Sequence, residues 1–176
     1  SFEGEFKAID DQSIILPRNG GLLSGRVHDF SNGDTDQKLT VYPLKNGPAT
    51  YTIALQWNDS LYSIGQTGTQ YDFDIYLKNF QNSPLYGFNR DNSGGDPVEI
   101  LTFSVSAKTD INLVIARECS TCNEADFLSG NIAFKYVIFR GELSIADANE
   151  YFTGSSTIVG QANASGAMSV GAILYS

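Results

Sequence analysis

Apolar and polar side chains alternate with a period of two residues along the middle of this chain. The segments with this period are 37–43, 50–57, 71–78, 98–105, 111–117 and 131–140. Successive side chains of a β-strand point to opposite faces, so each segment predicts a strand with one buried face. Two such faces exclude water by packing against each other. The pattern therefore predicts an all-β fold, an antiparallel β-sandwich or jelly roll.

Composition limits the partners that such a sandwich can have. The 176 residues include 20 acidic and 11 basic side chains, for a net charge of −9. A field of this sign repels phosphate backbones, so we expect no nucleic-acid partner. No apolar run approaches the roughly 20 residues that a membrane-spanning helix needs, so we expect no membrane span.

The C-terminal part has a different character. Residues 143–176 are rich in Gly and Ala, and GAMSVGAIL (166–174) runs on without polar alternation. A strand of this kind expects cover on both faces, as in a parallel sheet flanked by helices. We therefore predict a sandwich domain over 1–142, followed by a linker and a segment of another, α/β domain over 143–176. Without those helices, 164–174 is expected to be disordered, or to be buried against a neighbour or against the edge of the sandwich.

Oxygen-bearing side chains predict a possible calcium site. Asn58, Asp59, Asp72 and Asp74 are the candidate ligands, and Asp72 and Asp74 share one face of their strand. Calcium takes six to eight oxygen ligands, which suits such a set. A second oxygen-rich segment, 89–96, is a weaker candidate because it lacks the spacing of an EF-hand loop. The alternative is a solvated face on which Asp side chains cap turns.

Aromatic side chains suggest a platform for sugars or peptides. Trp57 and Tyr71 fall on apolar strand faces, which favours the core. Tyr76 falls on a polar face and Tyr62 in a long loop, so these two are the predicted ligand-binding residues. Tyr86 is the fifth aromatic residue considered for this platform.

Two other features have ordinary structural interpretations. Cys119 and Cys122 lie in a polar loop, where a local disulfide or two thiols is more common than zinc or redox chemistry. His28 is the only histidine and precedes Asp29. No activated serine accompanies this pair, so we interpret it as a turn and not as part of a catalytic triad.

The residues also carry a family resemblance. STIVGQANASGAMSVGAILY (156–175) resembles a core segment of subtilisin-like serine proteases, with Val170, Gly171 and Ala172 at a Val-Gly-Ala signature. The body is similar to a β-sandwich insert of secreted bacterial subtilases and to bacterial pre-peptidase C-terminal domains. The stretches that carry this likeness are HDFSNGDTDQ (28–37), LQWNDS (55–60), YDFDIYL (71–77), GGDPVEIL (94–101), NLVIAR (112–117) and NIAFKYVIF (131–139).

The resemblance implies a non-catalytic domain of a secreted, extracellular subtilisin-like serine endopeptidase. The family's Gly-Thr-Ser nucleophile motif is absent, and the chain begins at Ser1 without a leader, so we expect an excised piece of a longer protein. Its expected role is to assist the binding or access of the parent's protein or peptide substrate. Two alternatives remain open: a carbohydrate-binding or adhesion module, and a structural or self-association insert.

Overall fold

The computed structural model describes residues 2–9, 17–18, 21–22, 25–79, 84–88, 90–118, 126, 132–140, 146–148 and 151. These residues form strands and one short 3-10 helix, η1 (Tyr62–Ile64). The strands are β1 (Phe2–Glu5), β2 (Ala8–Ile9), β3 (Pro17–Arg18), β4 (Gly21–Leu22), β5 (Gly25–His28), β6 (Gln37–Val41), β7 (Ala49–Trp57), β8 (Asp72–Lys78), β9 (Pro84–Phe88), β10 (Val98–Val105), β11 (Thr109–Glu118), β12 (Ala133–Arg140) and β13 (Ala146–Ala148).

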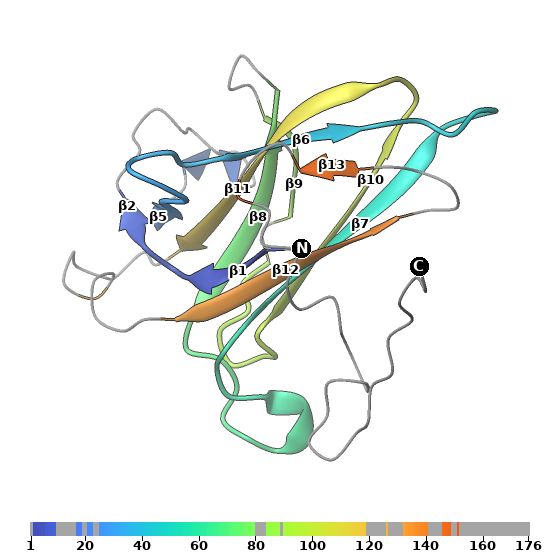
Figure 1. The fold of residues 1–176 in the computed structure, drawn as a ribbon. Coiled ribbons are helices and arrows are strands. Elements are labelled where there is room, and N and C mark those ends of the chain that lie inside the picture. Colours follow the sequence, from blue (N-terminus) through green and yellow to red (C-terminus); the bar gives the residue numbers. More distant parts are fainter. Residues whose placement is uncertain are drawn as a thin grey trace, which may run out of the picture.

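Two antiparallel sheets form the body of the molecule (Figure 1). The first sheet has four strands in the order β1-β12-β7-β10. The second has the order β13-β6-β11-β5-β2, and β8 pairs with the other edge of β11 and carries β9. β3 and β4 form a separate two-stranded ribbon. The sheets pack together as predicted, so the expected all-β sandwich is confirmed.

The core fills the space between the sheets with the residues that the period of two selects. On β7, Tyr51, Ile53 and Leu55 are fully buried. Phe73, Ile75 and Leu77 of β8 join them in one hydrophobic cluster. Burying side chains of this size contributes roughly 1.5–3 kcal/mol each, so this layer is the main source of stability.

Strand β8 departs from the simple alternation because both of its faces are buried. Its second face packs in a smaller apolar cluster, in which Tyr76 joins Val27, Val114 and Ala116, with Ile9 alongside. Tyr76 is 2% exposed, so the prediction that it is a surface residue is wrong. The polar neighbours of Tyr76 suggested a solvated face, but neighbouring strands supply apolar cover that one strand's sequence does not reveal.

The sandwich continues beyond residue 142. β13 pairs with β6, with Ala146 opposite Val41. Tyr151 stacks on Phe30 at 5.7 Å between ring centroids, and its hydroxyl donates to Asp34 Oδ2 at 2.9 Å. Residues 152–176, which carry the subtilase-like signature, lie outside the described residues, as do Cys119 and Cys122.

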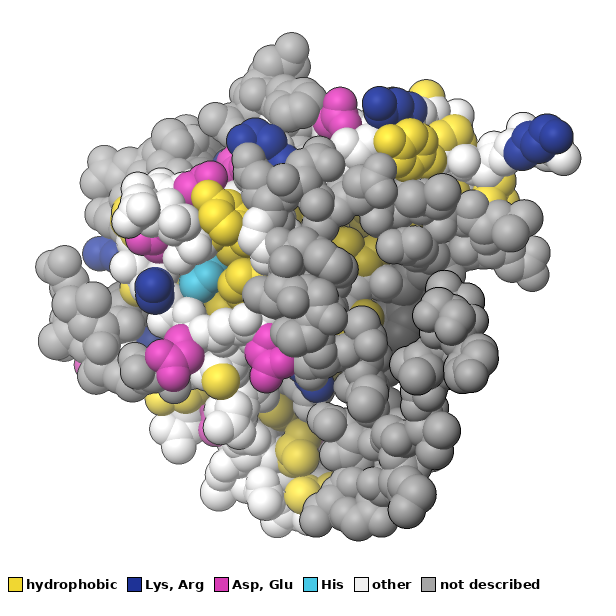
Figure 2. All heavy atoms as spheres, viewed as in Figure 1, with side chains coloured by type: hydrophobic (Ala, Val, Ile, Leu, Met, Phe, Trp, Pro, Cys, Tyr) yellow, Lys and Arg dark blue, Asp and Glu magenta, His cyan; other side chains and the backbone are white. Residues whose placement is uncertain are grey.

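Among the described residues visible in Figure 2, acidic and basic side chains are interspersed, without a large patch of a single sign. Within the described residues, no helix has the length and apolar character needed to cross a membrane.

Candidate functional site

Three carboxylates gather where β8 and β11 pair. Asp72 lies opposite Glu118 and Asp74 lies opposite Ala116 in the antiparallel register. One carboxylate oxygen from each of Asp72, Asp74 and Glu118 lies within 4.8 Å of the other two. We call these three residues the acidic cluster. All three are buried, and Asp74 has no exposed surface.

Two further polar side chains approach the acidic cluster from the strand and loop that follow β9. The backbone N–H of Asn92 donates to Asp72 Oδ1 at 3.1 Å. The Asn92 side chain is anchored because its Nδ2 donates to the carbonyl of Val98 at 2.6 Å. Glu99, on the buried face of β10, is 1% exposed and interacts electrostatically with Asp72 and Asp74. The two candidate calcium segments of the sequence therefore meet in space.

Burial and mutual repulsion control the protonation of these acids. Burial, followed by the charges of Asp72, Glu99 and Glu118, raises the pKa of Asp74 to about 9, although the Tyr76 hydroxyl donates to its Oδ2 at 3.3 Å. Burial also raises the pKa of Glu99 to about 8, although hydrogen bonds from the Arg90 backbone and the Asn92 side chain and the charge of Arg90 oppose the rise. The folded chain thus disfavours the ionised forms of both acids in the absence of a compensating positive charge.

Asn58 and Asp59, the other two predicted calcium ligands, are placed differently. The Asp59 carboxylate holds the loop that follows β7: Oδ2 accepts from Thr69 Oγ1 and the Gln70 N–H, and Oδ1 accepts from the Ser60 N–H, each at 2.7 Å. Asn58 is exposed. The structure brings Asp72 and Asp74 together with Glu118, and this group of acids does not include Asp59.

The loop that Asp59 organises carries the exposed aromatic residue. We call residues 58–70 the tyrosine loop. Its tip, η1, presents Tyr62 and Ile64, each 65% exposed. The predicted exposure of Tyr62 is thus confirmed.

The tyrosine loop is fastened to the loop that precedes β10. The Ser63 N–H donates to Asp96 Oδ1 at 2.9 Å, the Thr69 N–H to the Gly95 carbonyl at 2.8 Å, and the Gly94 N–H to the Thr69 carbonyl at 2.8 Å. A Cβ on Gly68, whose φ is +82°, would collide with the backbone of Gly94. The two loops therefore form one compact unit, which gives the exposed side chains of Tyr62 and Ile64 a fixed support.

Trp57 contributes to this support and not to a binding surface. It is 3% exposed, and its indole N–H donates to Thr69 Oγ1 at 2.9 Å, so its prediction as a core residue is confirmed. Tyr71 is half-buried, with the Arg117 guanidinium 4.5 Å from its ring centroid. The side chain of Tyr86 lies outside the described residues.

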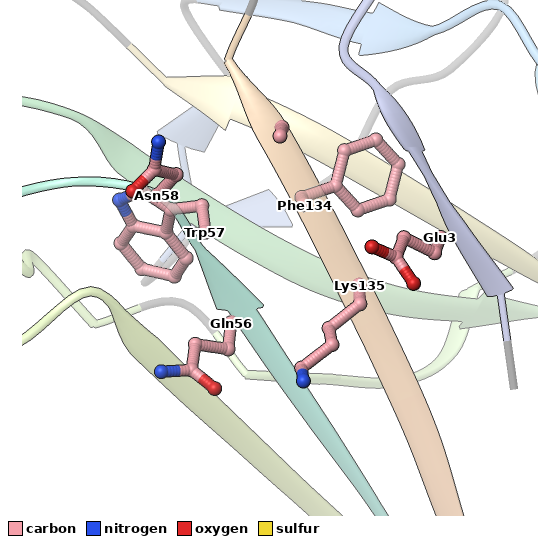
Figure 3. A pocket seen from close by; sticks show the side chains of 7 residues that line it. Glu3, Gln56, Trp57, Asn58, Phe134 and Lys135 are labelled. Carbon is pink, nitrogen blue, oxygen red and sulfur yellow. The ribbon is translucent and has the colours of Figure 1, made fainter. Parts of the chain in front are cut away.

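A pocket of about 260 Å³ opens beside Trp57, on the outer face of the four-stranded sheet (Figure 3). Its lining residues are Glu3, Gln56, Trp57, Asn58, Ala133, Phe134 and Lys135. Glu3 and Lys135 are cross-strand partners of opposite charge. Trp57 and Phe134 are nearly buried, so the pocket offers polar side chains and little aromatic surface for stacking.

His28 lies in an aromatic cage on the inner face of β5. Four rings surround its imidazole, with centroids 4.6–5.9 Å away: Phe2, Phe6, Phe30 and Phe134. Its Nδ1 accepts from the Lys7 N–H at 3.1 Å, and the side chain is 3% exposed. Burial lowers the pKa of His28 to about 4, so the ring is neutral at pH 7. Asp29 Oδ1 instead accepts from the Gly33 N–H at 2.8 Å, which agrees with the turn interpretation.

Comparison with known proteins gives no independent assignment. No protein family matches the chain, and no curated protein resembles it significantly.

Sequence reasoning missed Glu99 and Glu118. Each is a single acid at or near a strand terminus, with no motif around it. Only the pairing of β11 with β8, and the packing of β10 beside β8, brings them to the acidic cluster. A signal was available for Glu99, because it replaces an apolar residue on the face that also carries Leu101 and Phe103.

Proposed function

We propose that this chain is a non-catalytic β-sandwich module of a secreted, extracellular subtilisin-like serine endopeptidase, and that it binds the polypeptide substrate of its parent through the tyrosine loop. The parent is proposed from the sequence resemblance. The burial of His28 among aromatic rings supports the proposal that the chain is non-catalytic. The exposed tip of the tyrosine loop supports the proposal that it binds substrate.

A serine protease of this class needs an imidazole that takes a proton from the serine and returns it to the leaving group. The chain's single histidine is enclosed by four aromatic rings, and its Nδ1 accepts a backbone hydrogen bond. The His28 side chain is 3% exposed, which leaves little of the ring accessible to a substrate. We therefore expect this chain to hydrolyse no peptide, and we assign the catalytic groups to the parent's own domain.

The tyrosine loop has the properties of a small recognition surface. Tyr62 and Ile64 expose most of their apolar area at neighbouring positions. Backbone hydrogen bonds to Asp96 and Gly95 fix the loop before any partner arrives. A preorganised apolar contact loses little entropy on binding, and binding energy gained away from the reacting bond assists catalysis in the parent.

The test measures binding of unfolded, carboxymethylated casein to the full chain by biolayer interferometry. We expect saturable binding that weakens at least about tenfold when Tyr62→Ala and Ile64→Ala are combined. Ile100→Ala is the matched control, because Ile100 is also an exposed apolar residue (51%) but lies on β10. Absence of binding, or equal binding by the double variant, contradicts the proposal.

A carbohydrate-binding function is the second candidate, favoured by the 65% exposure of the Tyr62 ring. Sugars stack on aromatic faces, whereas a polypeptide uses aromatic and aliphatic contacts alike. Retention on insoluble polysaccharide that is lost in Tyr62→Leu and kept in Ile64→Ala would identify this function in place of the first.

A further inference from the structure

Buried oxygen atoms without hydrogen-bond partners collect around the acidic cluster. Within the described part of the chain, Asp74 Oδ1, Asn92 Oδ1 and Glu99 Oε1 are buried and accept no hydrogen bond. Their residues are 0%, 3% and 1% exposed. A buried acceptor without a donor typically costs about 1–3 kcal/mol, and more when it is charged. Three such atoms in one neighbourhood indicate that a positively charged group belongs there.

The spacing of the acidic cluster fits a single ion. Calcium binds oxygen at about 2.3–2.6 Å, so two oxygens on one ion lie at most about 5 Å apart. Asp72, Asp74 and Glu118 meet this condition, because one carboxylate oxygen of each lies within 4.8 Å of the other two. Strand pairing fixes two of these acids opposite each other, and the Asn92 N–H holds the Asp72 carboxylate in place.

The donor chemistry selects among cations. The acidic cluster and the neighbouring Glu99 and Asn92 offer carboxylate and amide oxygens, with neither the imidazole nor the thiolate ligands that zinc and the later transition metals prefer. Magnesium keeps several of its waters and demands octahedral geometry, whereas calcium accepts many protein oxygens in irregular arrangements. A buried site with several carboxylates and an amide oxygen is therefore better suited to calcium.

We propose that Asp72, Asp74 and Glu118 bind one calcium ion where β8 and β11 pair, with Asn92 and Glu99 beside the site. A bivalent cation converts the repulsion among these acids into attraction. The Asn92 N–H, which donates to Asp72 Oδ1, connects the site to the loop before β10, and this loop supports the tyrosine loop. This inference concerns the chain's own fold and does not depend on the proposed role in proteolysis.

Calcium binding is tested on the full chain after treatment with a chelator. Isothermal titration with CaCl₂ is expected to give one ion per chain, and MgCl₂ is expected to bind at least about tenfold more weakly. At a hundredfold excess over Kd, calcium is expected to raise Tm by about 5–10 °C. If CaCl₂ produces neither heat nor a change in Tm, the proposal is overturned.

The Asp74→Asn variant distinguishes a calcium ligand from a purely structural acid, because only a ligand changes the order of the melting temperatures when calcium is added. In chelator at pH 7, the variant is expected to melt above the wild type, because an amide avoids the cost of burying a carboxyl that ionises in the unfolded chain. In calcium the order is expected to reverse, because the variant loses a ligand and its affinity falls at least about tenfold. An Asp74→Asn variant that binds calcium as well as the wild type overturns the proposal.

Two further variants keep the test decisive. Glu118→Gln removes a ligand at the end of β11, and is expected to weaken calcium binding at least about tenfold even if Asp74→Asn does not fold. Glu5→Gln changes the net charge equally at an exposed position on β1, and is expected to bind calcium like the wild type. If Glu5→Gln and Glu118→Gln weakened calcium binding equally, the loss of affinity would follow from net charge alone, and the proposed site would be contradicted.

Discussion

His28 and Asp74 are both buried titratable residues, but their surroundings treat them in opposite ways. His28 sits among four aromatic rings, and its Nδ1 accepts the Lys7 N–H. Asp74 sits among other carboxylates, and its Oδ1 accepts no hydrogen bond from the described residues. Among the described residues, His28 has no buried polar atom without a hydrogen-bond partner, whereas Asp74 has one. This difference separates a residue that builds the fold from one that is available for binding.

The largest change in stability is expected when the imidazole is removed from the aromatic cage. His28→Ala leaves a cavity among Phe2, Phe30 and Phe134 and removes the acceptor of the Lys7 N–H. We expect the free energy of unfolding in urea to fall by about 3–5 kcal/mol, as for other large core side chains. A loss below about 1 kcal/mol would mean that the cage does not contribute to the core.

The next effect concerns pH. The pKa of His28 falls from 6.5 in the unfolded chain to about 4 in the folded one, because burial outweighs the attraction of Asp29 and adds to the repulsion of Lys7. The unfolded state binds the proton first, so this contribution to stability is complete above pH 6.5 and is lost as the pH falls toward 4. The loss amounts to about 3 kcal/mol.

His28→Gln isolates this contribution, because it removes the titrating group and keeps a polar side chain of similar size. Between pH 6.5 and 4, we expect the unfolding free energy of the wild type to fall relative to that of the variant. A difference that stays constant over this range would show that His28 is accessible to protons in the folded state.

The smallest effect tests the only hydrogen bond to Asp74 that the structure gives among the described side chains. Tyr76→Phe removes the donor to Asp74 Oδ2 and is expected to cost about 1 kcal/mol in chelator. In calcium the cost should shrink, because the ion supplies the positive charge that the carboxylate lacks. Tyr151→Phe, which removes a donor to the less buried Asp34, should cost the same with and without calcium.

The sequence predicted the sandwich because the alternation of β7, β10 and β12 reflects one buried face per strand. It misplaced Tyr76 because β8 is covered on both faces, and the cover comes from β5 and β11. It found Asp72 and Asp74 by their spacing on one strand. It could not find Glu99 or Glu118, because strand pairing and packing bring them close, and neither is visible in a local motif.

The contact between Gly68 and Gly94 has a consequence for how new specificities can be built on this molecule. A Cβ at Gly68 would collide with the Gly94 backbone, and both glycines have a positive φ that strains other residues, +82° at Gly68 and +77° at Gly94. Residues 62–64 project beyond this junction and are free of that constraint. A library that randomises 62–64 and keeps both glycines would therefore diversify recognition on an unchanged scaffold.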